Sequence, residues 1–562
     1  MKNRLIPYLI MTLMACVGTS QANTIYDFAL IDQQGKFHQL SWYGDQSAIV
    51  FFFQDTQCGD DDAALQQYAK LKQQFKNQPI SFFIINSESN LSNQAVATSL
   101  KSLNIDFPVL MDESQLVAER LGITSSQETI VVNPNQWQIT YQGSFEQNEL
   151  SSILKNLANN SAPAAQKTPP TKGCPLQFEP QPAAISYSED VAPILLKRCV
   201  SCHQEGGIAP WAMTSHEMVR GWSAMIKEVL YTKRMPPGQI DTRNSHTIND
   251  LNELPADEMR TLIAWINRGG QKDQGDDPLA AYLPDGNKWQ LGEPDYVIKV
   301  PSQKVPANGI VDYRYIPIRL PFQEEKWVKG IEFLPGDQKA LHHVIAYITQ
   351  PGERLSRAAR LGASQRESLG GYAPGKQPVF FRDNSGRLLK RRSNLLLQMH
   401  YTTTGKATTD ETEIGLYFWD APPKYVMSGG VAGTLRLSIP PYAKEHQQQA
   451  EQYIRDDAYL YSMSPHMHYR GKYMRYIAQY PDGREETILN VANYQFNWQM
   501  TYQLKQPLFL PKGTRVIAQG AFDNSPQNPF NPDPSRNVGF GLQSFEEMFF
   551  GYMTLRYEGD TP

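Results

Sequence analysis

Strand-like and helix-like runs alternate over the first part of the chain. Three apolar runs read as buried strands, AIVFFF at 48–53, ISFFIIN at 80–86 and TIVVN at 129–133. They are separated by helix-like stretches such as AALQQYAKLKQQF at 63–75. Strands alternating with helices are typical of an α/β domain. We therefore predict an α/β domain over residues 24–155.

The pattern then changes twice. Residues 156–183 are rich in Pro, Ala and polar residues, which predicts a linker. Residues 185–270 read as mostly helical and end on PADEMRTLIAWINRGG, an amphipathic stretch stopped by glycines. This middle part is therefore predicted to be a small α-helical domain.

Short strands and Pro/Gly turns fill the rest of the chain. A second linker is predicted at 271–294. The following all-β part is long enough for two sandwich-sized units, placed at 295–430 and 431–560. The chain of 562 residues is thus expected to hold several domains.

The N-terminus reads as an export signal. Lys2 and Arg4 precede a mostly apolar stretch, and Ser20-Gln21-Ala22 is a small-x-small cleavage pattern, so residues 1–22 are predicted to be a signal peptide. A lipoprotein signal with Cys16 acylated is the alternative. No other stretch reaches the roughly 18 apolar residues of a membrane span. We expect a periplasmic or secreted protein without a transmembrane segment in the mature chain.

Net charge and cysteine content narrow the possible classes of function further. A net charge of −4 argues against nucleic acid as a partner. Of the five cysteines, Cys58 and Cys174 could form a disulfide in an oxidising compartment, although sequence does not show that they meet.

Two further cysteines form a C-x-x-C-H motif, Cys199-Val-Ser-Cys202-His203. Two thiols at this spacing can bond a haem while the adjacent histidine ligates its iron. A chance match, a zinc site or a redox pair are the alternatives. The segment resembles small class I-like c-type cytochromes. That resemblance implies one covalently attached haem c, with Met235 in the YTKRMPPGQ loop as the second axial ligand; the rivals are Met213, Met218 and Met225.

Histidines gather in the all-β part. The stretch SPHMHYRGK holds His466 and His468, which would face the same way on a strand. KALHHVIAYI holds His342 and His343, and QMHY holds His400. Imidazoles suit copper, zinc and iron, whereas a thioether such as that of Met548 favours Cu(I). The pattern indicates one site of three imidazoles and another of two imidazoles and a methionine.

These stretches carry a resemblance to a known family. RLPFQEEKWVKGIEFLPGDQKALHHVIAYI, QMHY, HMHYRGK and EEMFFGYM are similar, in that order, to the motifs of the copper type II, ascorbate-dependent monooxygenases, which include the peptidylglycine α-hydroxylating and dopamine β-monooxygenases. The resemblance covers about residues 295–560. It implies two consecutive jelly-roll sandwiches, each with one copper, facing across a solvent-filled cleft.

The same resemblance assigns roles to residues. His342, His343 and His400 would bind the electron-transfer copper, and His466, His468 and Met548 the copper where O2 is activated. Tyr552 keeps a tyrosine of the family's catalytic site, and Gln398 matches a residue that orients a ligand or water.

Some positions depart from the family pattern. Ser464 stands where the peptidylglycine branch has a substrate-binding arginine, and Phe550 replaces an asparagine. The family's disulfides are absent. A peptide with C-terminal glycine is therefore not the expected substrate.

The first domain resembles the thioredoxin-like redoxins. Cys58 is predicted at a strand-to-helix turn, but Asp61 occupies the second cysteine position of C-x-x-C. The usual cis-proline is also replaced, by Gln127-Glu128-Thr129. Both a redox-active Cys58 and a structural or docking domain remain open.

Together these features predict an exported copper-dependent monooxygenase. It would hydroxylate a C–H bond of a small substrate with O2, using two copper ions and electrons that an external donor passes through the haem. The alternatives are a non-catalytic redox carrier or copper-handling protein, and a peroxidase in which the first domain is the enzyme.

Overall fold

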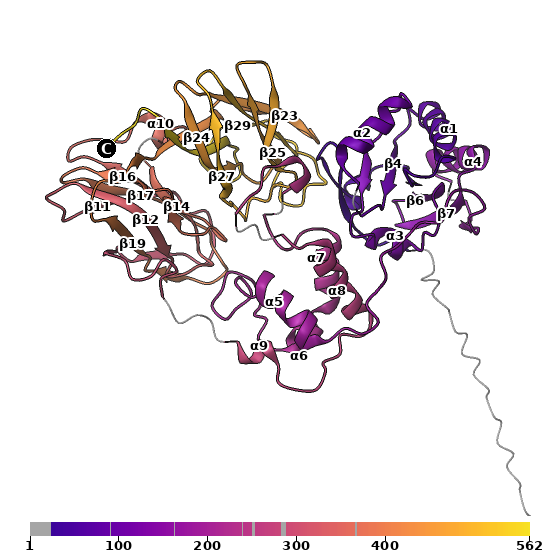
Figure 1. The fold of residues 1–562 in the computed structure, drawn as a ribbon, viewed down its shortest axis with the longest axis horizontal. Coiled ribbons are helices and arrows are strands. Elements are labelled where there is room, and N and C mark those ends of the chain that lie inside the picture. Colours follow the sequence, from indigo (N-terminus) through magenta and orange to yellow (C-terminus); the bar gives the residue numbers. More distant parts are fainter. Residues whose placement is uncertain are drawn as a thin grey trace, which may run out of the picture.

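The computed structural model describes residues 24–89, 91–161, 163–238, 240–249, 253–282, 288–365 and 368–562. The expected signal peptide, residues 1–22 with Cys16, lies outside this described part. Within it, no helix is both long and apolar enough to cross a membrane. Figure 1 shows an N-terminal α/β part, a group of helices and two groups of sheets.

The α/β part is built on one mixed sheet of eight strands in the order β2-β1-β5-β4-β3-β6-β7-β8. Its strands are β1 (Ala29–Asp32), β2 (Phe37–Gln39), β3 (Ala48–Gln54), β4 (Ile80–Asn86), β5 (Val109–Met111), β6 (Glu128–Asn133), β7 (Gln138–Ser144) and β8 (Gln166–Lys167). Its helices are α1 (Asp61–Gln74), α2 (Asn93–Ser102), α3 (Leu116–Leu121) and α4 (Gln147–Ala158). The predicted α/β domain is confirmed here, and β8, inside the predicted linker, extends its sheet.

The alternation of side chains along β3 supplies two cores. Val50 and Phe52 face the core formed with α1, α2 and α4. Phe51 and Phe53 face the opposite core, which includes α3. The second core continues into the helices that follow in the chain, among them Tyr231.

The middle part consists of short helices. They are the π-helical turn η2 (Tyr187–Val191), α5 (Ala192–Arg198), α6 (His216–Gly221), α7 (Ser223–Tyr231), the 3-10 turn η3 (Thr242–Asn244), α8 (Ala256–Asn267) and α9 (Pro278–Ala281). The buried Arg260 of α8 donates to the Ser114 carbonyl at 2.8 Å and pairs with Glu119 at 2.8 Å. The helices and the α/β part therefore share one packed core.

The first group of sheets contains the expected β structure after residue 295. Its elements are β9 (Tyr296–Lys299), β10 (Gln303–Val305), β11 (Arg314–Arg319), β12 (Lys326–Leu334), β13 (Leu341–Thr349), α10 (Arg357–Arg360), β14 (Ser368–Tyr372), β15 (Val379–Phe380), β16 (Ser385–Leu389), β17 (Asn394–Tyr401), β18 (Thr408–Asp410), β19 (Glu413–Trp419) and β20 (Tyr425–Val426). The sheet β11-β17-β13-β14 and the sheet β20-β16-β12-β19-β9 contribute to one core. We call this unit the first sandwich.

The second group also pairs two sheets. Its strands are β21 (Ser428–Thr434), β22 (Ser438–Ile439), β23 (His446–Tyr453), β24 (Ala458–His466), β25 (Gly471–Gln479), β26 (Glu485–Val491), β27 (Tyr502–Leu510), β28 (Arg515–Phe522), β29 (Val538–Gly539) and β30 (Phe549–Tyr557). The sheet β21-β30-β24-β27 faces the sheet β23-β28-β25-β26 across one core. Phe522 and Phe549 meet there with ring centroids 6.0 Å apart. We call this unit the second sandwich.

Asn490 of β26 joins three parts of the chain. Its side-chain amide donates to the Gly35 carbonyl of the α/β part at 2.8 Å. Its backbone N–H donates to Ser245 Oγ at 2.9 Å, and its carbonyl accepts from the Asp241 N–H at 2.9 Å. The helical part and the α/β part are thus both anchored on the second sandwich.

Candidate metal centres

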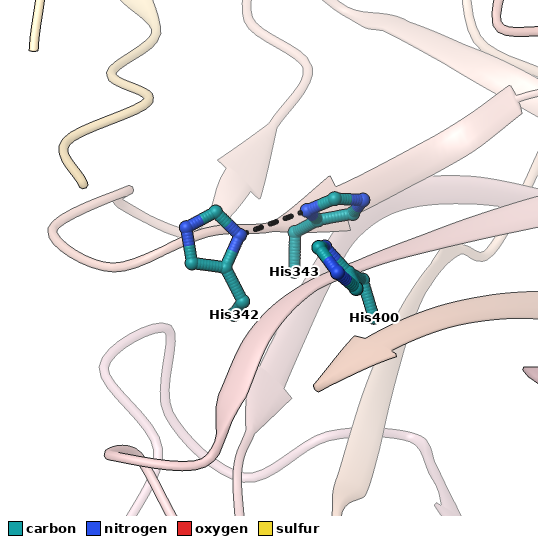
Figure 2. Close-up of side chains that lie close together, drawn as sticks. All are labelled: His342, His343 and His400. Atoms are coloured by element: carbon teal, nitrogen blue, oxygen red, sulfur yellow. Dashed lines mark hydrogen bonds between the residues drawn. The ribbon is translucent and has the colours of Figure 1, made fainter. Parts of the chain in front are cut away.

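The first set of histidines lies on two paired strands. His342 and His343 are consecutive on β13, and His343 lies opposite His400 on β17. Neighbouring residues on a regular strand point to opposite faces, but the register of β13 shifts between Leu341 and His343. This irregularity, a β-bulge, lets both imidazoles turn to the same side. Figure 2 shows the three rings converging.

These rings form a compact set of nitrogen ligands. One ring nitrogen from each of His342, His343 and His400 lies within 4.8 Å of those of the other two. Burial lowers the pKa of His342 to about 3 and that of His400 to about 4, with neighbouring histidines adding to the effect. The imidazoles are therefore neutral at pH 7 and available as ligands. His342 Nε2 and His400 Nδ1 are buried and find no hydrogen-bond partner among the described residues, which fits a metal ion at this position.

The second set combines two imidazoles and a thioether. His466 Nε2 lies 3.3 Å from the sulfur of Met548, and the rings of His466 and His468 are 5.3 Å apart. The Nδ1 of His466 is held by Gln499 Oε1 at 2.8 Å and the Nδ1 of His468 by the Glu546 carbonyl at 3.2 Å. Both Nε2 atoms are therefore left as ligands. Burial lowers the pKa of His466 to about 4 and that of His468 well below its usual value.

The strand argument for His466 and His468 holds only in part. Strand β24 ends at His466, so His468 lies beyond the ladder. Its position depends instead on Glu547, whose carboxylate accepts from the His468 N–H at 2.9 Å. Met467 points away into the core of the second sandwich, as expected, where Tyr494 binds its backbone.

A buried ion pair supports the second set. Glu547 also accepts from the Arg470 N–H at 2.7 Å, and its carboxylate lies 3.9 Å from the Arg470 guanidinium. Both side chains are almost fully buried, at 0% and 1% exposure. Sequence reasoning missed these two residues and Gln499. The two glutamates directly before Met548, at the start of the apolar run Met548-Phe549-Phe550, were the available signal.

The two sets lie side by side. The rings of His343 and His466 are only 6.3 Å apart. Phe496 stacks on His342 at 4.5 Å and meets the edge of His468 at 5.8 Å. Phe496 packs between His342 and His468, whereas His343 and His466 both line a cavity between the two sandwiches.

The remaining residues of the expected copper site surround a shared cavity. The Tyr552 ring lies 6.1 Å from that of His466, and both line the cavity. Ser464 Oγ hydrogen-bonds Thr501 Oγ1 at 2.8 Å. Gln398 also lines the cavity and donates to the Tyr315 hydroxyl at 2.8 Å.

The C-x-x-C-H motif follows α5. Cys199 and Cys202 form no disulfide with each other, and burial raises the pKa of Cys199 to about 12. The Nδ1 of His203 lies 3.0 Å from the Trp211 carbonyl, which leaves Nε2 as the free ligand atom. These residues fit a covalently bound haem.

Met235 lies on the loop after α7, which runs on to Gly238. The Gly238 carbonyl accepts from the Tyr502 hydroxyl of the second sandwich at 3.0 Å. Among the rival ligands, Met213 is buried, whereas Met218 and Met225 are exposed at 41% and 47%. Met235 as the axial ligand stays a prediction.

Cys58 and Cys174 form a disulfide, which settles the question that the sequence left open. Cys58 lies just before α1, and Cys174 comes from the predicted linker. The Ser126 N–H donates to the Cys174 carbonyl at 2.8 Å, and Ser126 Oγ donates to the buried Asp61 at 2.8 Å. The disulfide therefore attaches the linker to the turn before α1, which is the turn where a redoxin carries its reactive cysteine.

The family model that matches covers the first part of the chain. The model of the AhpC/TSA family matches residues 22–144. A search of curated proteins found no match. Among solved structures, a hypothetical protein from Sinorhizobium meliloti 1021 is 20% identical, covering 28% of this chain and 94% of its own, with a TM-score of 0.26.

Two further solved structures each match about a quarter of the chain. The exposed lipoprotein thioredoxin of Streptococcus pneumoniae strain TIGR4 is 20% identical, covering 23% of this chain and 99% of its own, with a TM-score of 0.22. The peroxidoxin BcpB of Mycobacterium tuberculosis is 19% identical, covering 24% and 94%, with a TM-score of 0.21. These scores support no conclusion on function. The family match and the mixed sheet agree with the expected thioredoxin-like domain at the N-terminus.

Proposed function

We propose that the chain is an exported copper-dependent monooxygenase that hydroxylates a C–H bond of a small substrate with O2. The observation that carries this proposal is the pairing of two different ligand sets. Three imidazoles on the first sandwich lie beside two imidazoles and a thioether on the second, 6.3 Å apart between their nearest rings. Copper bound at the two sets would supply two one-electron centres, which matches the two electrons that hydroxylation with O2 consumes.

The chain's own residues prepare these sites. The neutral, buried imidazoles need no deprotonation before they bind metal. Gln499 and the Glu546 carbonyl fix the orientation of the His466 and His468 rings. Phe496 packs between His342 of the first set and His468 of the second.

The helical part supports a haem as the electron relay. Tyr372, the last residue of β14, is paired with Val344 of β13, directly beside His343. The pKa of Tyr372 is raised to about 12, mainly by burial and then by Asp410 and Cys202. The Cys202 thiol is thus within electrostatic range of Tyr372 on this strand. A haem bonded there would receive electrons from an external donor close to the first copper.

Metal content and O2 consumption test the proposal. We expect about two copper ions per chain, one haem, and O2 consumption that depends on substrate and yields one product per O2. Met548→Ile should abolish hydroxylation and leave the haem spectrum intact. Met463→Ile is the matched control, because Met463 is buried in the core of the same sandwich and away from the ligands. Full activity of Met548→Ile would refute the role of Met548.

The alternative of a redox carrier or copper-handling protein gives a different outcome. Such a protein would bind copper and haem but consume no O2 in a substrate-dependent way. Rapid mixing of reduced haem protein with Cu(II) at the histidine sets tests the relay separately. If the haem is not oxidised within the molecule, the relay is refuted.

The Cys58–Cys174 disulfide favours a second activity, thiol–disulfide exchange or peroxide reduction by the first domain. The AhpC/TSA match agrees with this chemistry. Peroxide turnover by the full chain should then be lost in Cys58→Ser. Unchanged turnover would leave the disulfide with a structural role.

A further inference from the structure

A cavity of about 200 Å³ lies between the two sandwiches. Its wall includes ligands from both candidate copper sites, among them His343, His466 and Met548. Apolar residues form another part of the wall, including Leu369, Val379 and Phe381. The space suits a small molecule with an apolar body next to the second copper set.

The charged residues of this wall all have the same sign. Lys376, Arg382 and Arg387 line the cavity, and no aspartate or glutamate is among its described lining residues. Two of these cations donate to backbone carbonyls, Arg382 to Leu504 at 2.7 Å and Arg387 to Gln365 at 3.4 Å. These hydrogen bonds hold both arginines in place in the wall of the cavity.

Lys376 differs from both arginines. It follows the tight turn after β14, closed by its backbone N–H on the Ala373 carbonyl at 3.0 Å. Gly375 makes this turn with a φ of +78°, and a Cβ there would lie 3.1 Å from the Met500 sulfur and 3.4 Å from the Trp498 ring. Packing of this turn against the second sandwich therefore fixes the position of the Lys376 backbone.

The Lys376 ammonium has no hydrogen bond or ion pair within the part of the chain that the structure describes. Burial alone lowers its pKa to about 8, so it is still largely protonated at pH 7. Lys376 is only partly buried, so an anion that enters the cavity can reach its ammonium and form a charge-assisted hydrogen bond with it. The arrangement is that of a binding site for an anionic group.

We propose that the substrate is a small carboxylic acid with an apolar body, whose carboxylate binds the Lys376 ammonium. The apolar body then lies along the wall toward Met548 and His466, where the C–H bond is hydroxylated. This inference rests on the proposed function for the reaction, but the binding of the acid does not depend on turnover.

Calorimetric binding to the full-length, haem-loaded protein tests the proposal. The probes are 3-phenylpropanoate and its uncharged isostere, 3-phenylpropanamide. We expect the acid to bind about tenfold or more tightly than the amide, because a charge-assisted hydrogen bond forms only with the carboxylate. Lys376→Met should weaken binding of the acid by about the same factor and leave that of the amide unchanged. Lys512→Met is the control, since Lys512 is exposed on the second sandwich.

Two outcomes overturn the proposal. Equal binding of the acid to wild type and Lys376→Met, or no binding of the acid to wild type, removes the site. A haem propionate is the other carboxylate that Lys376 could bind. In that case Lys376→Met shifts the haem potential and leaves acid binding unchanged, which also refutes the substrate assignment. If the acid binds as expected but no O2 is consumed, the monooxygenase proposal fails and the anion site stands.

Discussion

Glu547 connects the second ligand set to the buried backbone around it. Its two carboxylate oxygens accept from the N–H groups of His468 and Arg470, at 2.9 and 2.7 Å. The carboxylate is also the nearby counter-charge of the buried Arg470 guanidinium. Glu547→Ala removes all three interactions while leaving every metal ligand in place.

The stability lost in Glu547→Ala follows from the buried groups that lose their partner. Each buried N–H without an acceptor costs about 1–3 kcal/mol. Removal of one partner from a buried ion pair costs about 3–5 kcal/mol. The two estimates overlap and are not added in full. Arg470 also keeps its bonds to Asn524 and to the Phe545 carbonyl, both at 2.9 Å, which limits the loss. We therefore expect the region around His468 to lose about 3–5 kcal/mol of stability.

Amide hydrogen exchange of peptides that cover His468 and Arg470 measures this loss. A change of about 3 kcal/mol corresponds to an opening equilibrium increased by about 100-fold or more. Glu547→Gln, which keeps one acceptor oxygen, should show a smaller increase. The control is Glu451→Ala, whose half-exposed pair with Arg515 is worth about 0–1 kcal/mol. If Glu547→Ala exchanges no faster than Glu451→Ala, the supporting role of Glu547 is refuted.

Three further outcomes are expected. Burial raises the pKa of Asp112 from 3.8 to about 6. Its contribution to the stability of the first domain should therefore fall as pH rises from about 4 to 6 and stay level above about pH 6. Thermal unfolding of Asp112→Asn should lack this fall in stability between about pH 4 and 6. Asn490→Ala removes the bond to the Gly35 carbonyl and should cost about 1 kcal/mol, seen as faster amide exchange around Gly35 than in the wild type. On the proposed function, His400→Ala should reduce copper content from about two ions per chain to about one, measured by elemental analysis.

Local patterns were sufficient for the first domain. The runs at 48–53 and 80–86 became β3 and β4, because continuous apolar stretches of this length are buried on both faces of a sheet. The amphipathic stretch that ends in Gly269-Gly270 became α8. The pairing of Cys58 with Cys174, 116 residues apart, was not predictable, because local sequence says nothing about which distant segment crosses the turn.

The histidine ligands were identifiable by type, but their geometry was not. Strand periodicity places His342 and His343 on opposite faces, and only the register shift on β13 brings them together. A bulge depends on how the partner strand β17 pairs, which is a tertiary property. His468 likewise owes its position to Glu547, which is 79 residues away.

The separation of the two ligand sets is the feature that sequence patterns could least predict, and it matters most for the chemistry. It is decided by side chains between the sandwiches, chiefly Phe496, which contacts His342 on one side and His468 on the other. Neither sandwich alone contains that contact. Because His343 and His466 are 6.3 Å apart, an electron that reaches the first set has only a short distance to the second. A smaller residue at 496 would remove the ring that spans the two sets, so the spacing of the centres rests on packing between sandwiches rather than on the ligands themselves.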